Sequence, residues 1–443
     1  MNYLEKQEFS KLINTRTDIR GGFVNLLKKS IYFLYPYDKD YIFIKGSMDE
    51  MRKDSSKTIV WSLDHSWNSV EFGLPGLYYL KQKHEVRLIF FAGDAGIWNK
   101  CQEEHFIFDI IKRIFDVVIV NSKPVRQKSW VKRKIQRLKK SLFEYNTYRY
   151  FFRDVNVDIL LELNNPIRVK EYFYNEHPET LHVCHQHSTF QKSIYYPDEE
   201  YLPLPKVDYM LCTDDYLLQI VGKEDAKKIA VIGAPQLDKW WRDLSGRNEL
   251  AKLKMKLHSD RKTIVVLLPC LEGNERLFPE DYESLHRVLN DNAENVNIIL
   301  KFHPRDILET RERFVSAIKD GNDVNNVIST TVITECLSEL ADCVIVAGAT
   351  SAAAGAIIND VPVIEFHANK PMTLLYEKDG RYGTYFRIMN LILYAENYSQ
   401  LKQAVHGVLY EGLWKKYKGK YKGYMLNDNC SSKRFAEILI NLL

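Results

Sequence analysis

The stretch that decides the fold is Asn297-Ile298-Ile299-Leu300-Lys301-Phe302-His303-Pro304-Arg305. Its apolar part has the length of a buried strand, and cationic side chains follow at once. Pro304 disfavours a helical conformation at the preceding residue, so we expect His303 in an extended turn at the strand tip. Ligands of open α/β sheets bind at the carboxyl ends of strands. The stretch therefore predicts an α/β sheet with an anion site for a phosphate, the alternative being a plain turn.

Strand-like and helix-like segments alternate along most of the chain. The pattern predicts strands at residues 41–44, 58–63, 86–91, 116–121, 157–163, 181–189, 207–212, 228–235, 263–268, 296–302, 327–328, 343–347 and 361–366. Helical patterns lie between many of them, including residues 69–82, 100–114, 279–290, 308–319 and 334–340. This alternation is typical of βαβ units and a parallel sheet.

The length of 443 residues exceeds what one hydrophobic core usually serves. Polar, charged sequence from Trp240 to Lys262 separates two halves. We therefore predict two α/β domains, at residues 1–245 and 246–425. Residues 426–443 are predicted to form a helix, with Ser431 or Ser432 as N-cap, that packs back across the domain junction.

Composition excludes several classes of protein. A net charge of +4 and the lack of a recognisable binding module argue against nucleic acid as a partner. The seven cysteines are scattered singly, which fits reduced thiols in a cytosol. Neither a signal peptide nor an apolar run long enough to span a membrane is recognisable. The sequence predicts a cytoplasmic protein.

One segment is strongly basic. Nine basic residues and no acidic residue lie between Lys123 and Lys140, with apolar residues at helical spacing. Such a run is most often a solvated helix face. The alternative is an interfacial helix attracted to anionic lipid headgroups, which would place the protein on the inner face of the cytoplasmic membrane.

A second candidate anion site begins at Gly348-Ala349-Thr350-Ser351, directly after the predicted strand 343–347. Small residues let a ligand approach the backbone, the hydroxyls of Thr350 and Ser351 donate hydrogen bonds, and a helix start supplies free N–H groups. Close packing of a helix on the sheet is the alternative reading. Together with His303, the pattern favours a phosphate site.

Several residues are candidates for a general base. His182, His185 and His187 invite a zinc hypothesis, but the first two should face opposite sides of a strand and lack a carboxylate at ligand spacing, so we predict no metal. His187 lies in the loop that follows, where it could take a proton from an acceptor hydroxyl. Glu272 and Asp94 follow other predicted strands and are alternative bases, although turn residues are commoner there.

The two predicted domains, the Lys301-Phe302-His303-Pro304-Arg305 motif, Thr350-Ser351 and the returning helix resemble the GT-B glycosyltransferase fold, in which two Rossmann-like domains face each other across a cleft. Within that fold the pattern is similar to bacterial enzymes that use cytidine nucleotides: teichoic-acid glycerophosphotransferases, sialyltransferases with a His-Pro motif, and capsule Kdo transferases. The resemblance covers most of residues 180–370.

The resemblance implies roles for individual residues. His303 would hold or protonate the donor phosphate, Thr350 and Ser351 would bind the same phosphate, and His187 lies where the glycerophosphotransferases place a catalytic His followed by Gly. Here the next residue is Ser188, and Glu272-Gly273 matches only part of the acidic-acidic-Gly motif of the sialyltransferases. The residue that contacts the donor ribose stays unassigned.

These observations predict an inverting, metal-independent glycosyltransferase. It would move a sugar from a CMP- or CDP-linked donor, its substrate, to a bacterial surface glycan or lipid-linked acceptor, and it would need no cofactor. The predicted donor-phosphate site comprises Lys301, His303, Arg305, Gly348, Thr350 and Ser351. The alternatives are glycerophosphate transfer from CDP-glycerol, 2-epimerisation of a nucleotide sugar, and a scaffold that retains a relict nucleotide pocket.

Overall fold

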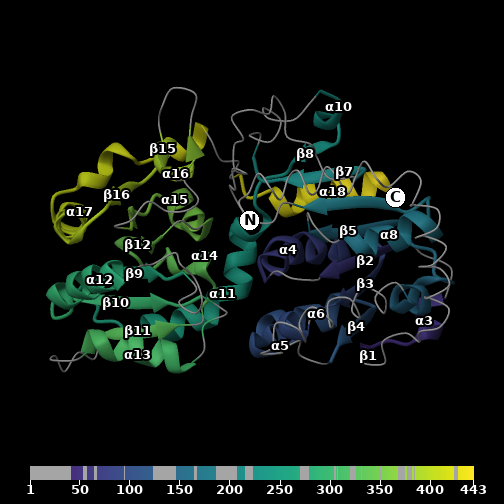
Figure 1. Cartoon of the computed structure of the whole chain (residues 1–443), viewed down its shortest axis with the longest axis horizontal. Coiled ribbons are helices and arrows are strands. Elements are labelled where there is room, and N and C mark those ends of the chain that lie inside the picture. Colours follow the sequence, from purple (N-terminus) through teal and green to yellow (C-terminus); the bar gives the residue numbers. More distant parts are fainter. Residues whose placement is uncertain are drawn as a thin grey trace, which may run out of the picture. The chain divides into compact units, whose positions relative to one another are not determined.

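The computed structural model describes most of the chain (Figure 1). The described residues are 41–52, 57–63, 67–93, 95–122, 146–163, 167–185, 207–214, 223–269, 279–303, 306, 308–319, 326–330, 332–348, 351–367, 375–376, 382–383, 385–423 and 428–443. The chain divides into two compact units: Met1–His65, Glu85–Asn99 and Phe115–His182 form the first, and Ser66–His84, Lys100–Ile114 and Val183–Leu443 form the second. The predicted domain limits at residues 245 and 425 stay a prediction.

The first sheet has eight strands in the order β1-β4-β3-β2-β5-β6-β7-β8. Its strands are β1 (Tyr41–Lys45), β2 (Thr58–Leu63), β3 (Arg87–Ala92), β4 (Val117–Asn121), β5 (Ile159–Leu163), β6 (Leu181–His185), β7 (Tyr209–Cys212) and β8 (Ile229–Val231). β2 pairs in parallel with β3 and β5, and only β1 is antiparallel to its neighbour among the pairs whose register is described. Every residue of β2, β3 and β4 is buried, which explains their continuous apolar runs.

Helices and short turns connect these strands. They are α3 (Met48–Arg52), α4 (Trp67–Lys83), α5 (Ala95–Glu103), α6 (His105–Ile114), α8 (Ile167–Glu176), α10 (Lys223–Ala226) and the 3-10 turn η1 (Pro235–Leu237). α6 shows why such segments fold as helices, since its four isoleucines repeat at helical spacing and are all buried. Among the described residues, no helix has the length and apolar character that crossing a bilayer requires.

The second sheet has six strands in the order β11-β10-β9-β12-β13-β16 (Figure 1). They are β9 (Lys262–Leu267), β10 (Val296–Lys301), β11 (Val327–Thr330), β12 (Cys343–Ala347), β13 (Val363–Phe366) and β16 (Leu393–Ala395), and every neighbouring pair is parallel. The chain builds outward from β9 to β11 and then returns to β12 on the other side of β9. This is the doubly wound Rossmann order, and the prediction of an α/β protein with two Rossmann-like sheets is confirmed.

Helices cover both faces of the second sheet. α12 (Pro279–Asn292), α13 (Leu308–Lys319) and α17 (Tyr398–Tyr410) share one buried cluster with Ile298 and Leu300. Ile299 points to the other face, into a cluster with α11 (Lys239–Lys254), α14 (Thr334–Leu337), α15 (Ala354–Ile358) and α16 (Tyr385–Ile388). A two-stranded ribbon, β14 (Leu375–Tyr376) with β15 (Tyr382–Gly383), also belongs to this unit.

The polar segment from Trp240 to Lys262 is not simply the polar separator that its composition predicts. Most of it is helix α11, which buries Trp241, Arg242, Gly246 and Leu253. A Cβ on Gly246 would lie 2.3 Å from the Sγ of Cys336, so the glycine permits the close approach of α11 to α14. The segment forms a helix because a few residues at helical spacing are buried, although its overall hydrophobicity is low.

The predicted N-cap of the last helix is wrong. Helix α18 (Ser431–Leu442) has Cys430 at its N-cap position, without a side-chain cap. The two carboxylate oxygens of the buried Asp238 instead accept the backbone N–H groups of Ser431 and Ser432, at 3.1 and 2.7 Å. A carboxylate stabilises a helix N-terminus through these hydrogen bonds and the helix dipole. α18 then packs on α4, where Phe435 lies against Gly76.

Candidate functional site

The candidate site lies at the carboxyl ends of β9, β10, β12 and β13. Lys301, the last residue of β10, stands in register with Leu267 of β9, which in turn pairs with Val346 of β12. The N–H of Leu268 donates to the carbonyl oxygen of Lys301 at 2.9 Å. The strand order reverses between β9 and β12. Crevices at such switch points bind ligands in open α/β sheets.

Lys301 interacts electrostatically with carboxylates that sequence patterns did not reveal, Glu335 among them. By strand alternation it shares a face with Ile299, the face that α14 covers, and Glu335 lies on α14. Burial lowers the pKa of Lys301, and the carboxylates of Glu104 and Glu71 oppose that shift, as does Glu335. Burial likewise raises the pKa of Glu335, against the charge of Lys301. The Oε2 of Glu335 is buried and makes no hydrogen bond within the described part of the chain.

The turn after β10 fixes His303. Its carbonyl oxygen accepts the N–H of Asp306 at 3.0 Å and the guanidinium of Arg311 at 3.5 Å. The His303 side chain is half-buried, two residues beyond Lys301. Pro304 and Arg305 lie outside the described residues. The structure thus brings two of the three predicted cations to one strand end.

The turn after β12 differs from its prediction in one respect. Gly348 has the left-handed backbone conformation, φ 81°, that glycine favours, but its N–H donates to the carbonyl oxygen of Phe366 at 2.8 Å. The predicted helix start is a 3-10 turn, η2 (Ser351–Ala353), followed by the five residues of α15. So short a helix has a small dipole. Thr350 and the side chain of Ser351 lie outside the described residues.

A buried pair on β13 was missing from the sequence prediction. The Nε2 of His367 lies 3.1 Å from the Oε1 of Glu365, and both side chains are almost fully enclosed. The N–H of His367 donates to the carbonyl oxygen of Ala395, which holds the residue at the carboxyl end of the strand. The signal in the sequence was a Glu and a His two apart at the end of an apolar strand, since residues at that spacing share a face.

The carboxyl ends of the first sheet carry a different set of groups. Ser62 of β2 is in register with Glu162 of β5, and both side chains are buried. His182 stacks on Tyr174 and His185 stacks on Phe72, consistent with the predicted opposite faces of β6. The candidate bases Asp94, His187 and Glu272 lie outside the described residues, as does the basic run from Lys123 to Lys140.

No group of three or more metal-binding side chains occurs within the described ranges. Lys301, His303 and the His367–Glu365 pair stand at the same end of the sheet, where hydrogen-bond donors of this kind can hold a phosphate. A carboxylate such as Glu335 only accepts hydrogen bonds, so it suits a hydroxyl of the same ligand.

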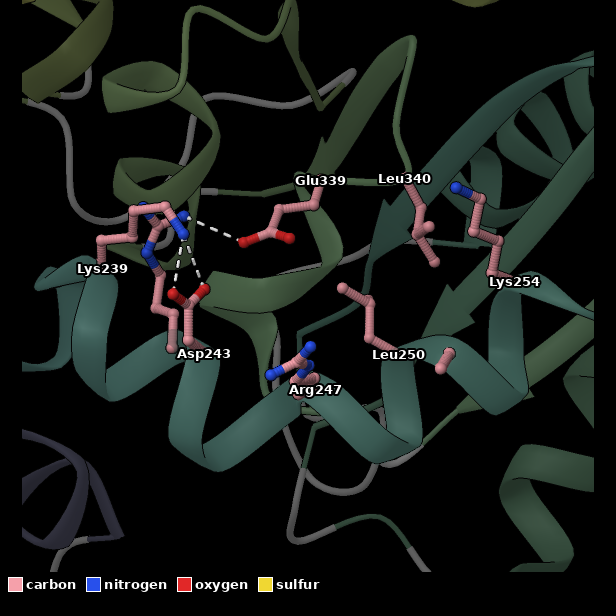
Figure 2. A pocket seen from close by; sticks show the side chains of 9 residues that line it. Lys239, Asp243, Arg247, Leu250, Lys254, Glu339 and Leu340 are labelled. Carbon is pink, nitrogen blue, oxygen red and sulfur yellow. Dashed lines mark hydrogen bonds and ion pairs between the residues drawn. The ribbon is translucent and has the colours of Figure 1, made fainter.

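Helix α11 packs closely on α14, the helix that carries Glu335. A cavity of about 480 Å³ lies beside α11, and none of the predicted site residues lines it. Figure 2 shows the side chains that do. There the guanidinium of Arg242 lies 3.5 Å from Glu339, and Lys239 pairs with Asp243 at 2.7 Å. Arg242 also opposes the rise in the pKa of Glu335. The close α11–α14 packing at Gly246 therefore helps to set the charge environment of Glu335.

Comparison with known proteins shows the fold. No protein-family model matches the sequence, and no curated protein sequence matches it. Among solved structures, the wall teichoic acid polymerase TagF is 16% identical with a TM-score of 0.55, over 97% of both chains. The glycotransferase of kitacinnamycin is 10% identical with a TM-score of 0.57, over 88% of this chain and all (100%) of that one.

UDP-GlcNAc 2-epimerase from Neisseria meningitidis bound to UDP-GlcNAc is 11% identical with a TM-score of 0.57, over 87% of this chain and 100% of that one. The neighbours therefore include GT-B glycosyltransferases and nucleotide-sugar epimerases, which matches the predicted fold class. At these identities the likeness defines a fold and leaves the substrate open.

Proposed function

We propose that the protein is a glycosyltransferase that moves a sugar from a nucleotide donor to a bacterial surface glycan. The observation that carries this proposal is Lys301 with His303 at the end of β10, beside the switch point of a sheet with the Rossmann order. The fold neighbours support a nucleotide-sugar substrate, since one is bound to UDP-GlcNAc. The proposed acceptor is a capsule, lipopolysaccharide or teichoic acid chain.

The proposed chemistry is inverting and independent of a metal. Lys301 and His303 would neutralise charge on the departing nucleotide, and Thr350 and Ser351 would donate to the same phosphate. Glu335 would accept hydrogen bonds from the ribose hydroxyls, a contact that sequence analysis left unassigned. His187, or one of the carboxylates Asp94 and Glu272, would take the proton of the acceptor hydroxyl.

The proposed donor is CMP- or CDP-linked, and the proposed location is the cytoplasm. The cytidine assignment rests on the resemblance of Lys301-Phe302-His303-Pro304 to enzymes of that group. A peripheral position on the inner face of the membrane, through Lys123 to Lys140, remains a proposal on residues outside the described ranges.

A thermal-shift panel of CMP, CDP, UDP, GDP and ADP tests the proposal. A ligand that binds only the folded protein raises its melting temperature, and saturation at about a hundred times Kd adds roughly 2.7 kcal/mol of stability. We expect cytidine nucleotides to stabilise the wild type and to lose that effect in His303→Ala, whose own melting temperature should stay near that of the wild type. Stabilisation by no nucleotide would overturn the proposal in favour of a scaffold.

Two other reactions are supported by particular neighbours. A nucleotide-sugar 2-epimerase, like the proteins of that name among the neighbours, would convert UDP-sugar without any acceptor. A glycerophosphotransferase is supported by the similarity to TagF and would add a glycerophosphate mass to the acceptor. Incubation of the enzyme with donor alone, then with donor and acceptor, separates the three reactions by product mass.

A further inference from the structure

A short segment of the second unit carries five lysines and no acidic residue. It runs from Gly412 to Gly423 and comprises two 3-10 turns, η3 (Leu413–Lys416) and η4 (Lys420–Gly423). We call its five lysine side chains the lysine face: Lys415, Lys416, Lys418, Lys420 and Lys422. Such a density of one charge needs an explanation, because neighbouring like charges repel one another.

The aromatic residues of the segment hold it to the fold. Trp414 is buried in the core cluster of α12 and α17, and its indole N–H donates to the carbonyl oxygen of Asp360 at 3.0 Å. The N–H of Gly419 donates to the Oδ1 of the same Asp360 at 2.7 Å. Tyr417 packs against that core and Tyr421 against the core on the other face of the sheet. The backbone is therefore fixed from two sides.

The lysine side chains of the segment lie at the surface of the protein. All five side chains are exposed. Within the described part of the chain, none of them forms an ion pair or hydrogen bond with an acidic side chain. Two of the ammonium groups, those of Lys416 and Lys420, lie 5.1 and 5.0 Å from the centre of the Tyr417 ring. The face thus presents five exposed ammonium groups that form no ion pair among the described residues.

The chemistry of the face favours one kind of partner. Single-stranded nucleic acid is bound through aromatic platforms on which bases stack, but Trp414, Tyr417 and Tyr421 are used for packing. A lysine ammonium group acts as a point charge and needs no particular geometry in its anionic partner. Each basic residue near an anionic bilayer contributes about 1 kcal/mol of attraction. We propose that the lysine face is a docking surface for a bilayer of anionic phospholipid.

The position of the face is compatible with an open nucleotide site. Asp360, its anchor, lies just before β13, at the amino end of that strand. His367 and the candidate site lie at the opposite, carboxyl end. Contact with a bilayer would thus leave the carboxyl edge of the sheet accessible. The inference goes beyond the proposed reaction and does not depend on it.

Vesicle co-sedimentation tests the inference with the full chain. One set of vesicles is phosphatidylcholine mixed with phosphatidylglycerol, and the other is phosphatidylcholine alone. The test variant replaces the five lysines of the face by glutamine. The control variant removes five exposed positive charges elsewhere in the same unit: Lys83→Gln, Lys223→Gln, Lys252→Gln, Lys254→Gln and Lys256→Gln. Melting temperatures of all three proteins establish that they fold.

We expect the wild type to bind only the anionic vesicles, with an affinity that falls as salt is added. The test variant should bind about tenfold more weakly or worse, and the control within about twofold of the wild type. Equal loss in both variants, or no loss in the test variant, would overturn the inference. So would binding of the wild type to soluble polyphosphate with none to vesicles. If nucleotides still raise the melting temperature of the test variant, loss of vesicle binding does not affect the proposed reaction.

Discussion

The two sheets share a winding order but differ in the charge at their carboxyl ends. At the switch point of the first sheet, Ser62 and Glu162 offer a hydroxyl and a carboxylate. At the corresponding end of the second, Lys301 and His303 follow one strand and His367 ends another, with Glu335 on the covering helix. Ligands of open α/β sheets bind at such ends. We therefore propose anion binding at the second sheet and proton transfer at the first.

The largest effect should come from a residue that follows β6 of the first sheet in the sequence. His187→Ala is expected to lower turnover by about 10²- to 10⁴-fold, the usual contribution of a general base, while nucleotide affinity stays unchanged. Steady-state kinetics together with nucleotide titration measure the two quantities. Retained turnover would remove His187 from the mechanism, and the same assays on Asp94→Asn and Glu272→Gln would then identify the base.

The second sheet should respond in binding as well as rate. Lys301→Met removes a positive charge at the candidate phosphate site, so kcat/KM should fall by about 100-fold and the thermal shift with nucleotide should disappear. Lys262→Met is a matched control, because Lys262 begins β9 at the opposite end of the same sheet and pairs on the surface with Asp342. Equal effects in both variants would contradict a special role for the carboxyl end.

A smaller effect is expected at Glu335, which is proposed to contact the ribose rather than the phosphate. Glu335→Gln should weaken nucleotide binding by up to about tenfold, because a hydrogen bond contributes about 0.5–1.5 kcal/mol. The variant should also lose preference for CMP over its 2′-deoxy analogue, which isothermal titration with both ligands would measure. If the variant keeps the full preference, another residue contacts the ribose.

The smallest effect concerns stability and lies away from the site. Burial lowers the pKa of His286 on α12, whose ring centre lies 4.4 Å from that of Phe314. Protonation therefore favours the unfolded chain: stability is full above the unfolded pKa of about 6.5 and is lost as pH falls toward the lower folded value. His286→Phe should show a smaller drop in melting temperature between about pH 7 and 5. If the melting temperature of the variant drops as far as that of the wild type, groups other than His286 cause the acid sensitivity.

Sequence patterns located most strands and several helices, because side-chain periodicity is a local property. The strand ending at Lys301, the turn at Gly348 and the helix ending at Leu442 all followed from it. The same patterns missed α11, whose few buried residues are dispersed among charges. They also did not single out the His367–Glu365 pair, although two residues at that spacing at the end of an apolar strand share a face.

The sequence by itself determined the two Rossmann-like sheets and the cations that follow β10, since burial of apolar strands and the conformation before Pro304 depend on adjacent residues. Only the tertiary structure placed Glu335 near Lys301 and Asp238 at the start of α18, residues separated from their partners by 34 and 193 positions. Such pairs form because packing brings helices close together. The absence of a side chain at Gly246, for example, lets α11 approach Cys336 of α14. A charge acts through space, so its partner is fixed by packing rather than by position in the chain.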